Sequence, residues 1–149
     1  MSILFYIIFL PLITIILLLN CVEKKNMQLI RGISLILASF TFLLSLYLLF
    51  FFDQLSNLFQ YHFFLDNYFS YKLIFGIDGI SIFFVLLVTF ISLLCVLITF
   101  RRTFGIKFIL IYIFLIEFFC LIIFTVLDIF IFYMFFESVL MPMFVMIGV

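Results

Sequence analysis

The chain has 149 residues, of which 70% are hydrophobic and 9% charged, and its mean hydropathy is +1.62. A soluble domain of this size leaves roughly 30% of its unfolded surface in water, so it could not hide this much apolar surface. The composition therefore excludes a soluble globular domain. The seven cationic and seven anionic residues are spread along the chain and form no basic patch, which argues against nucleic acid as a partner.

The first 100 residues contain three long stretches without charged side chains, at residues 1–22, 32–52 and 79–100. About 20 apolar residues suffice to cross a bilayer core roughly 30 Å thick, so each stretch predicts one membrane-spanning helix surrounded by lipid. The first stretch lacks the positive region and cleavage site of a secretory signal and the arginines of a mitochondrial presequence. We therefore expect it to be retained as a span.

Residues 108–149 form one long apolar run, interrupted only by Glu117, Asp128 and Glu137. A single helix of this length would reach about 63 Å, twice the membrane, so the run must turn back once. Asp128 is the best turning point because a carboxylate is cheaper at the interface than in lipid. The sequence thus predicts one all-α membrane domain, a polytopic bundle with spans at about 1–22, 29–52, 79–100, 107–127 and 129–148.

The Lys and Arg residues are concentrated in every second connection between the predicted spans. Six of the seven lie in the first and third connections or at their edges: Lys24, Lys25, Arg31, Arg101, Arg102 and Lys107. By the positive-inside rule these two connections face the matrix or cytoplasm, and the 53–78 loop faces the opposite side. For this loop we expect an interfacial segment with a short helix or hairpin, and Gly76 and Gly79 around Asp78 predict a turn and N-terminal cap for the third span.

Small residues recur at helical spacing in the second span, at Ser34, Ala38, Thr41 and Ser45. This stripe predicts close contact with a neighbouring helix, and packing is its better interpretation. The cysteines form no CxxC pair, and two of them lie deep in apolar runs. We interpret all three as packing residues and expect no metal site or disulfide.

Glu117 and Glu137 are the candidate functional residues. A helix pair turning at Asp128 carries them about 16 Å and 13 Å into the membrane, where a charged carboxylate costs roughly 2.5 to 3.5 kcal/mol. Desolvation and a nearby cation act in opposite directions on a carboxylate's affinity for protons, so such a group can serve as a proton relay. Alternatively, each glutamate is a protonated hydrogen-bond partner or half of a static ion pair. No cation lies at membrane depth in these 149 residues, so an ion-pair partner must come from another segment or chain.

Pro142 follows Glu137 by five residues. It removes the hydrogen bond to the Ser138 carbonyl and is expected to kink or loosen the helix next to the candidate relay.

Two stretches, LDIFIFYMFFESVLMPMFVMIGV and FGIDGISIFF, carry a family resemblance. From about residue 27 to 149 the chain closely resembles the mitochondrially encoded subunit 4 family of the proton-pumping NADH:ubiquinone oxidoreductase, respiratory complex I. The resemblance implies the first five of about fourteen helices of an antiporter-like subunit in the mitochondrial inner membrane. It also implies that Glu137 is the family's proton-relay carboxylate, normally facing a lysine on a broken seventh helix. Glu117 matches a glutamate of some members, and Asp128 an acidic position at the turn.

The sequence ends at IGV, where that family continues with some nine further helices and a second inverted repeat. We therefore expect either a separate chain that carries the remaining helices or a fragment, assembled with other membrane-arm subunits of complex I. No motif for a redox or other catalytic site is present in the sequence. We thus expect proton translocation in this chain, with NAD, FMN, iron–sulfur clusters and ubiquinone bound elsewhere in the assembly. The alternatives are a subunit of a related cation/proton antiporter or membrane-bound hydrogenase, or an inert structural scaffold.

Overall fold

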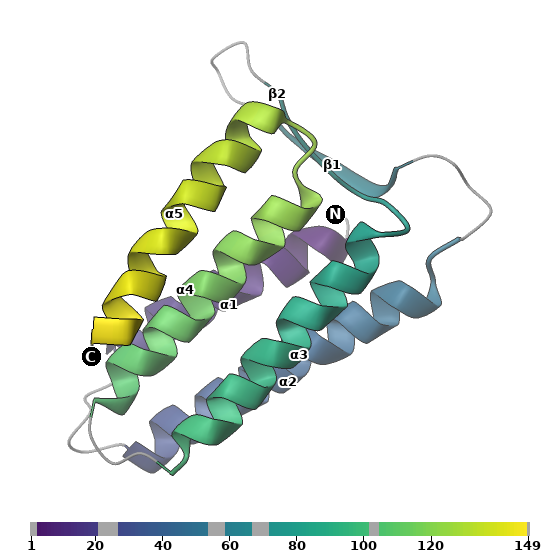
Figure 1. The fold of residues 1–149 in the computed structure, drawn as a ribbon. Helices are drawn as coiled ribbons and strands as arrows, with labels where there is room; N and C mark the ends of the chain where they lie inside the picture. Colours follow the sequence, from purple (N-terminus) through teal and green to yellow (C-terminus); the bar gives the residue numbers. More distant parts are fainter. Residues whose placement is uncertain (1–2, 21–26, 54–58, 67–71, 102–104, 149) are drawn as a thin grey trace.

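A computed structural model describes residues 3–20, 27–53, 59–66, 72–101 and 105–148, and within 62–66 and 72–73 it describes the backbone alone. Five α-helices and one hairpin follow each other along the chain (Figure 1). The helices are α1 (Ile3–Asn20), α2 (Met27–Phe50), α3 (Ser81–Thr99), α4 (Ile106–Thr125) and α5 (Ile129–Gly148), and the strands are β1 (Gln60–Asp66) and β2 (Lys72–Ile77). All five helices are long and apolar enough to cross a membrane, which confirms the predicted polytopic bundle.

Four of the helices form a closed bundle. The pairs α1 and α2, α2 and α3, α3 and α4, and α4 and α1 all pack together, whereas α5 packs on α4 from outside (Figure 1). The stripe of small residues on α2 is buried inside the bundle, as the spacing predicts: Ser34, Ala38, Thr41 and Ser45. Within it, Ser45 lies next to Thr89 of α3, and Thr41 lies next to Glu117 of α4. Small side chains on this face allow neighbouring helix backbones to approach closely.

The bundle interior consists of two apolar clusters separated by a polar layer. Near the hairpin, Leu4, Leu48 and Val85 belong to the first cluster, and toward the opposite end Leu18 and Phe114 belong to the second. Between them, each helix of the bundle buries at least one polar side chain, namely Thr14 on α1, Thr41 and Ser45 on α2, Thr89 and Ser92 on α3, and Glu117 on α4. Most of the buried polar side chains therefore lie at one level, while Ser34, Thr99 and Thr125 are buried elsewhere along their helices.

The described part of the 53–78 segment forms a hairpin. Its strands are antiparallel, with Phe63 opposite Phe75, and a bulge lies between Gln60 and Phe63. Tyr61, in this bulge, has a φ of 53° and donates a hydrogen bond from its hydroxyl to the Phe51 carbonyl at 2.8 Å. The hairpin is thereby tied to the end of α2 and lies across one end of the bundle (Figure 1).

The connection between α4 and α5 packs against the hairpin. Val126 pairs with Phe75, and the Leu127 N–H donates to the Ile74 carbonyl at 3.1 Å. This extended pairing ends α4 at Thr125, two residues before the predicted end of that span. The predicted turn at Asp128 is present, and the Asp128 carboxylate accepts a hydrogen bond from the Phe130 N–H at 2.9 Å, capping α5.

The start of α3 differs from the sequence prediction. A turn at Gly79 and Ile80 leads into the helix, and the Asp78 carbonyl accepts a bond from the Ile82 N–H at 3.1 Å. The expected side-chain cap is wrong, because Ile80 occupies the cap position and makes no side-chain cap bond. Asp78 therefore contributes its backbone, with its side chain exposed.

Apart from Glu117 and Glu137, the charged side chains that the structure describes lie toward the two ends of the bundle. At the end away from the hairpin, Arg31 stacks on Phe100 with 5.9 Å between its guanidinium carbon and the ring centroid, and Lys107 Nζ donates to the Leu19 carbonyl at 2.9 Å. The hairpin end carries Asp53, Asp78 and Asp128, which follow α2, precede α3 and precede α5 respectively. The predicted Lys24, Lys25 and Arg102 contributions lie outside the described residues.

Candidate functional site

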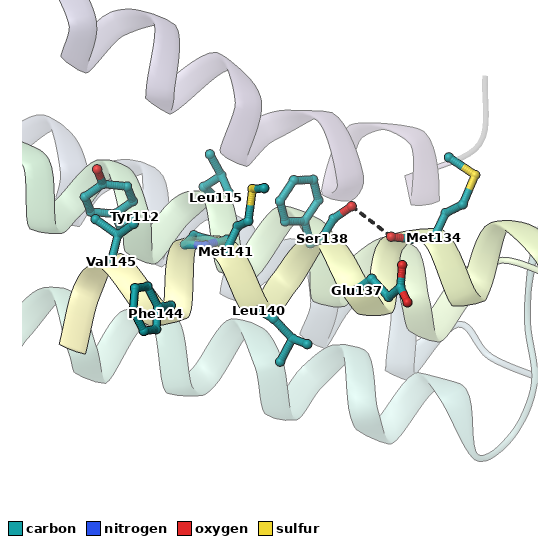
Figure 2. A pocket seen from close by; sticks show the side chains of 11 residues that line it. Tyr112, Leu115, Met134, Glu137, Ser138, Leu140, Met141, Phe144 and Val145 are labelled. Carbon is teal, nitrogen blue, oxygen red and sulfur yellow. Dashed lines mark hydrogen bonds between the residues drawn. The ribbon is translucent and has the colours of Figure 1, made fainter. Parts of the chain in front are cut away.

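A groove between α4 and α5 holds Glu137 (Figure 2). Its volume is about 1080 Å³, and its lining is mostly apolar. The lining residues come from α4 (Tyr112, Leu115, Phe119) and from α5 (Met134, Glu137, Ser138, Leu140, Met141, Pro142, Phe144, Val145). No Lys, Arg or His is among these described lining residues, so the groove contains one carboxylate without a basic counterpart from its own walls.

Two polar side chains of the same helix, Tyr133 and Ser138, lie close to Glu137 along α5. The Tyr133 hydroxyl, four residues earlier and therefore on the same face of α5, lies within hydrogen-bonding reach of the Glu137 carboxylate. The Ser138 hydroxyl instead donates to the Met134 carbonyl at 2.8 Å, as the dashed line in Figure 2 shows. Glu137 itself is exposed on the surface of the chain.

Pro142 lies in the wall of the groove beyond Glu137. The helix α5 continues through it, and of the twenty residues of α5, all described, only Pro142 is buried. Large apolar side chains cover the remaining surface of α5, and Ile129, Phe144 and Met141 are each more than three-quarters exposed. The face that carries Glu137 is thus uncovered by the described chain.

Glu117 occupies a different environment, inside the four-helix bundle. It is 2% exposed, and its Oε1 lies 3.3 Å from the Thr41 hydroxyl of α2. Ser92 of α3 also faces the carboxyl group, although its hydroxyl donates to the Thr89 carbonyl at 2.9 Å. The second oxygen, Oε2, is buried and has no hydrogen-bond partner among the described residues.

One turn nearer the hairpin, a hydroxyl pair continues this polar layer. Ser45 and Thr89 lie with their hydroxyl oxygens 2.9 Å apart, linking α2 to α3. We call Thr41, Ser45, Thr89, Ser92 and Glu117 together the polar cluster.

The two predicted site residues therefore lie on adjacent helices but not in one site. Glu117 does not line the groove, and Glu137 does not reach the polar cluster. The sequence interpretation missed Thr89 and Ser92 as neighbours of Glu117. Their three-residue spacing, extended by Thr99 seven residues on, was the available signal for a polar stripe on α3.

No metal-binding group is formed in the described part of the chain. No three His, Cys, Asp or Glu side chains come together there. Cys95 and Cys120 are free thiols, each partly buried within its helix, whereas Cys21 lies outside the described residues.

Comparison with known proteins gives relatives over most of the chain. It is 40% identical to NADH-ubiquinone oxidoreductase chain 4 of Arabidopsis thaliana, with 86% of this chain and 26% of the relative covered. It is 38% identical to the chain 4 protein of Chondrus crispus, covering 93% and 29%, and 36% identical to NADH-quinone oxidoreductase subunit M of Rickettsia typhi, covering 95% and 30%. No protein-family model matches the chain. The chain thus spans less than a third of the length of these relatives.

Proposed function

We propose, because the chain is homologous to chain 4 and subunit M of NADH-quinone oxidoreductase, that it is a proton-translocating membrane-arm component of respiratory complex I. The chain is a multi-pass membrane protein, and its plant and algal relatives support a place in the mitochondrial inner membrane. In this proposal NADH oxidation, and the NAD, FMN, iron–sulfur and ubiquinone sites, belong to other subunits of the assembly.

The observation that carries the proposal is the position of Glu137. It lies in an apolar groove on a membrane-length helix, where a charged carboxylate facing lipid would cost roughly 2.5 to 3.5 kcal/mol. A glutamate placed there without a function would be expensive, whereas a proton relay needs a carboxylate at this depth. We assign the relay to Glu137, with Pro142 as the adjacent position where a missing backbone hydrogen bond admits polar groups or water.

The proposed relay needs a partner from outside the described residues. We propose that a separate polypeptide, or the remainder of a longer chain, covers the groove with further helices and presents a lysine or another polar group to Glu137. The coverage of 26 to 30% of the relatives supports this partner. Neighbouring complex I subunits and lipid would cover the remaining exposed apolar faces.

The charge distribution supports an orientation for the bundle. We place the end that carries Arg31, Arg101 and Lys107 on the matrix side and the hairpin on the opposite side. Reporter tags inserted in residues 21–26 or 102–104 should then be accessible from the matrix, and a tag in residues 54–58 should not. Equal accessibility of all three positions would contradict this orientation.

Glu117 is the second proposed proton-exchanging residue. Its polar neighbours lie within the bundle, so its contribution to translocation should be smaller than that of a residue in an open groove. The alternatives, an antiporter or membrane-bound hydrogenase subunit and an inert scaffold, receive no support from the names of the relatives, which are NADH-quinone oxidoreductase subunits.

The test is Glu137→Gln, which keeps the shape of the side chain but removes its titrating group. In the reconstituted complex it should lower the proton-to-electron ratio while native gels show normal assembly. Glu117→Gln is the matched control, and it should lower the ratio less. An unchanged ratio in the assembled Glu137→Gln complex would favour the scaffold, and a larger loss from Glu117→Gln would reverse the order of the two residues.

A further inference from the structure

The Thr41 hydroxyl lies close to two oxygen atoms. It lies 2.8 Å from the Ala38 carbonyl of its own helix and 3.3 Å from Glu117 Oε1. A hydroxyl has one proton to donate and can accept from others. The Thr41 hydroxyl can donate to either oxygen, but the Ala38 carbonyl is the closer one, so the contact with Glu117 is the weaker of the two. A proton on Glu117 would strengthen this contact, because the carboxyl group could then donate to the Thr41 oxygen.

Ser92 leads to the same assignment. Its hydroxyl proton is directed to the Thr89 carbonyl at 2.9 Å, although the side chain faces the Glu117 carboxyl group. Oε2 of Glu117 therefore lies buried without a hydrogen bond among the described residues. An ionised carboxylate in this position would have one long hydrogen bond at Oε1, from a Thr41 hydroxyl shared with Ala38, and a buried Oε2 without a partner among the described residues, which is an expensive arrangement.

No cation compensates such a charge within the described residues. Lys107 lies ten residues before Glu117, about 15 Å along α4, and donates to the Leu19 carbonyl. Arg31 lies ten residues before Thr41, over the Phe100 ring. The Cys120 thiol, one turn further along α4, offers no positive charge either.

We propose that Glu117 is a built-in proton-binding site, a neutral carboxylic acid that donates to Thr41 and thereby links α4 to α2 with Ser92 of α3 as its second polar neighbour. The site is separate from the groove of Glu137. It deepens the proposed role of Glu117 as a proton-exchanging residue, but the bound proton does not depend on that role.

A neutral Glu117 also supplies a hydrogen-bond donor to the polar layer that lies between the two apolar clusters. Each hydroxyl of the layer donates to the carbonyl three residues earlier in its own helix, as Ser45 does to Phe42 at 2.7 Å and Thr89 to Leu86 at 3.0 Å. These hydroxyls are then free to accept. The Glu117 proton supplies the donor that the layer would otherwise lack between α4 and α2.

Infrared spectroscopy of the complex that contains this chain tests the proposal, since a protonated carboxyl group has a C=O stretching band that a carboxylate lacks. A difference spectrum at neutral pH between the wild type and Glu117→Gln should show the loss of one such band. In Thr41→Val this band should remain and move to higher frequency, because the acid loses its hydrogen-bond acceptor. Ser45→Ala is the matched control, since this hydroxyl lies in the same stripe but contacts Thr89, and it should leave the band in place.

Two results would overturn the proposal. If Glu117→Gln removes a carboxylate band instead, Glu117 is charged. If the acid band is present but Thr41→Val and Ser92→Ala both leave its frequency unchanged, the acid is not held by these hydroxyls. Ser92→Ala also serves as the informative variant if Thr41→Val does not assemble. Neither result depends on proton pumping, so a failure here would leave the proposed role of Glu137 to be judged by its own experiment.

Discussion

Glu117 and Glu137 lie twenty residues apart on two helices that pack together, yet their burial and their polar neighbours differ. Glu117 is 2% exposed and meets hydroxyl groups from two other helices of the bundle. Glu137 is exposed in a groove whose described walls contain no basic residue. Depth in an apolar segment therefore does not determine how a carboxylate is accommodated; the number of helices packed around it does.

The difference follows from how α4 and α5 are placed. The helix α4 contacts α1, α3 and α5, whereas α5 packs on α4 (Figure 1). The polar neighbours of Glu117, Thr41 and Ser92, thus come from α2 and α3. In the proposed relay, the polar partner of Glu137 comes from outside the described residues, and α5 would be the helix that contacts it.

The largest effect on stability should come from truncating the buried Glu117 side chain. Glu117→Ala removes a fully buried side chain and the proton donor to Thr41, and should cost about 2 to 4 kcal/mol. Glu117→Gln should cost under about 1 kcal/mol, because its amide N–H can donate to Thr41 in place of the acid. Thermal denaturation of the purified complex measures both variants, and equal losses would show that shape and hydrogen bonding at this position do not matter.

A smaller effect is expected one turn away. Ser45→Ala breaks the contact with Thr89 but leaves Thr89 bonded to the Leu86 carbonyl, so no buried group loses its last partner. The cost should be about 0.6 kcal/mol, which is typical of hydrogen bonds between membrane helices. The same denaturation assay measures it, and a loss as large as that of Glu117→Ala would mean that the hydroxyl pair, rather than Glu117, holds the layer together.

Much of the fold could be predicted from the sequence because each helix is a charge-free or nearly charge-free run of spanning length. Asp128 also marked the turn between α4 and α5, since a carboxylate favours a helix N-terminus over lipid. The earlier end of α4 was not predictable, because it depends on Val126 pairing with Phe75, fifty-one residues earlier in the chain. Hydropathy carries no information about such long-range strand pairing.

The candidate site was predictable only in part. The sequence identified both glutamates, and the stripe with Thr41 and Ser45 showed which face of α2 would be buried. Periodicity does not say which helices meet, so it could not bring Thr41 and Ser92 to Glu117 or leave Glu137 outside the bundle. That distinction arises from the packing order of the five helices.

A structure of the native assembly at a resolution that shows side chains is the most direct test of this comparison. The account predicts that a helix from outside the described residues covers the groove and places a lysine, or a polar group linked by water, next to Glu137. It also predicts that Thr41 and Ser92 remain the neighbours of Glu117. If lipid tails fill the groove and no polar group approaches Glu137, the division between a completed buried site and an open relay site is wrong.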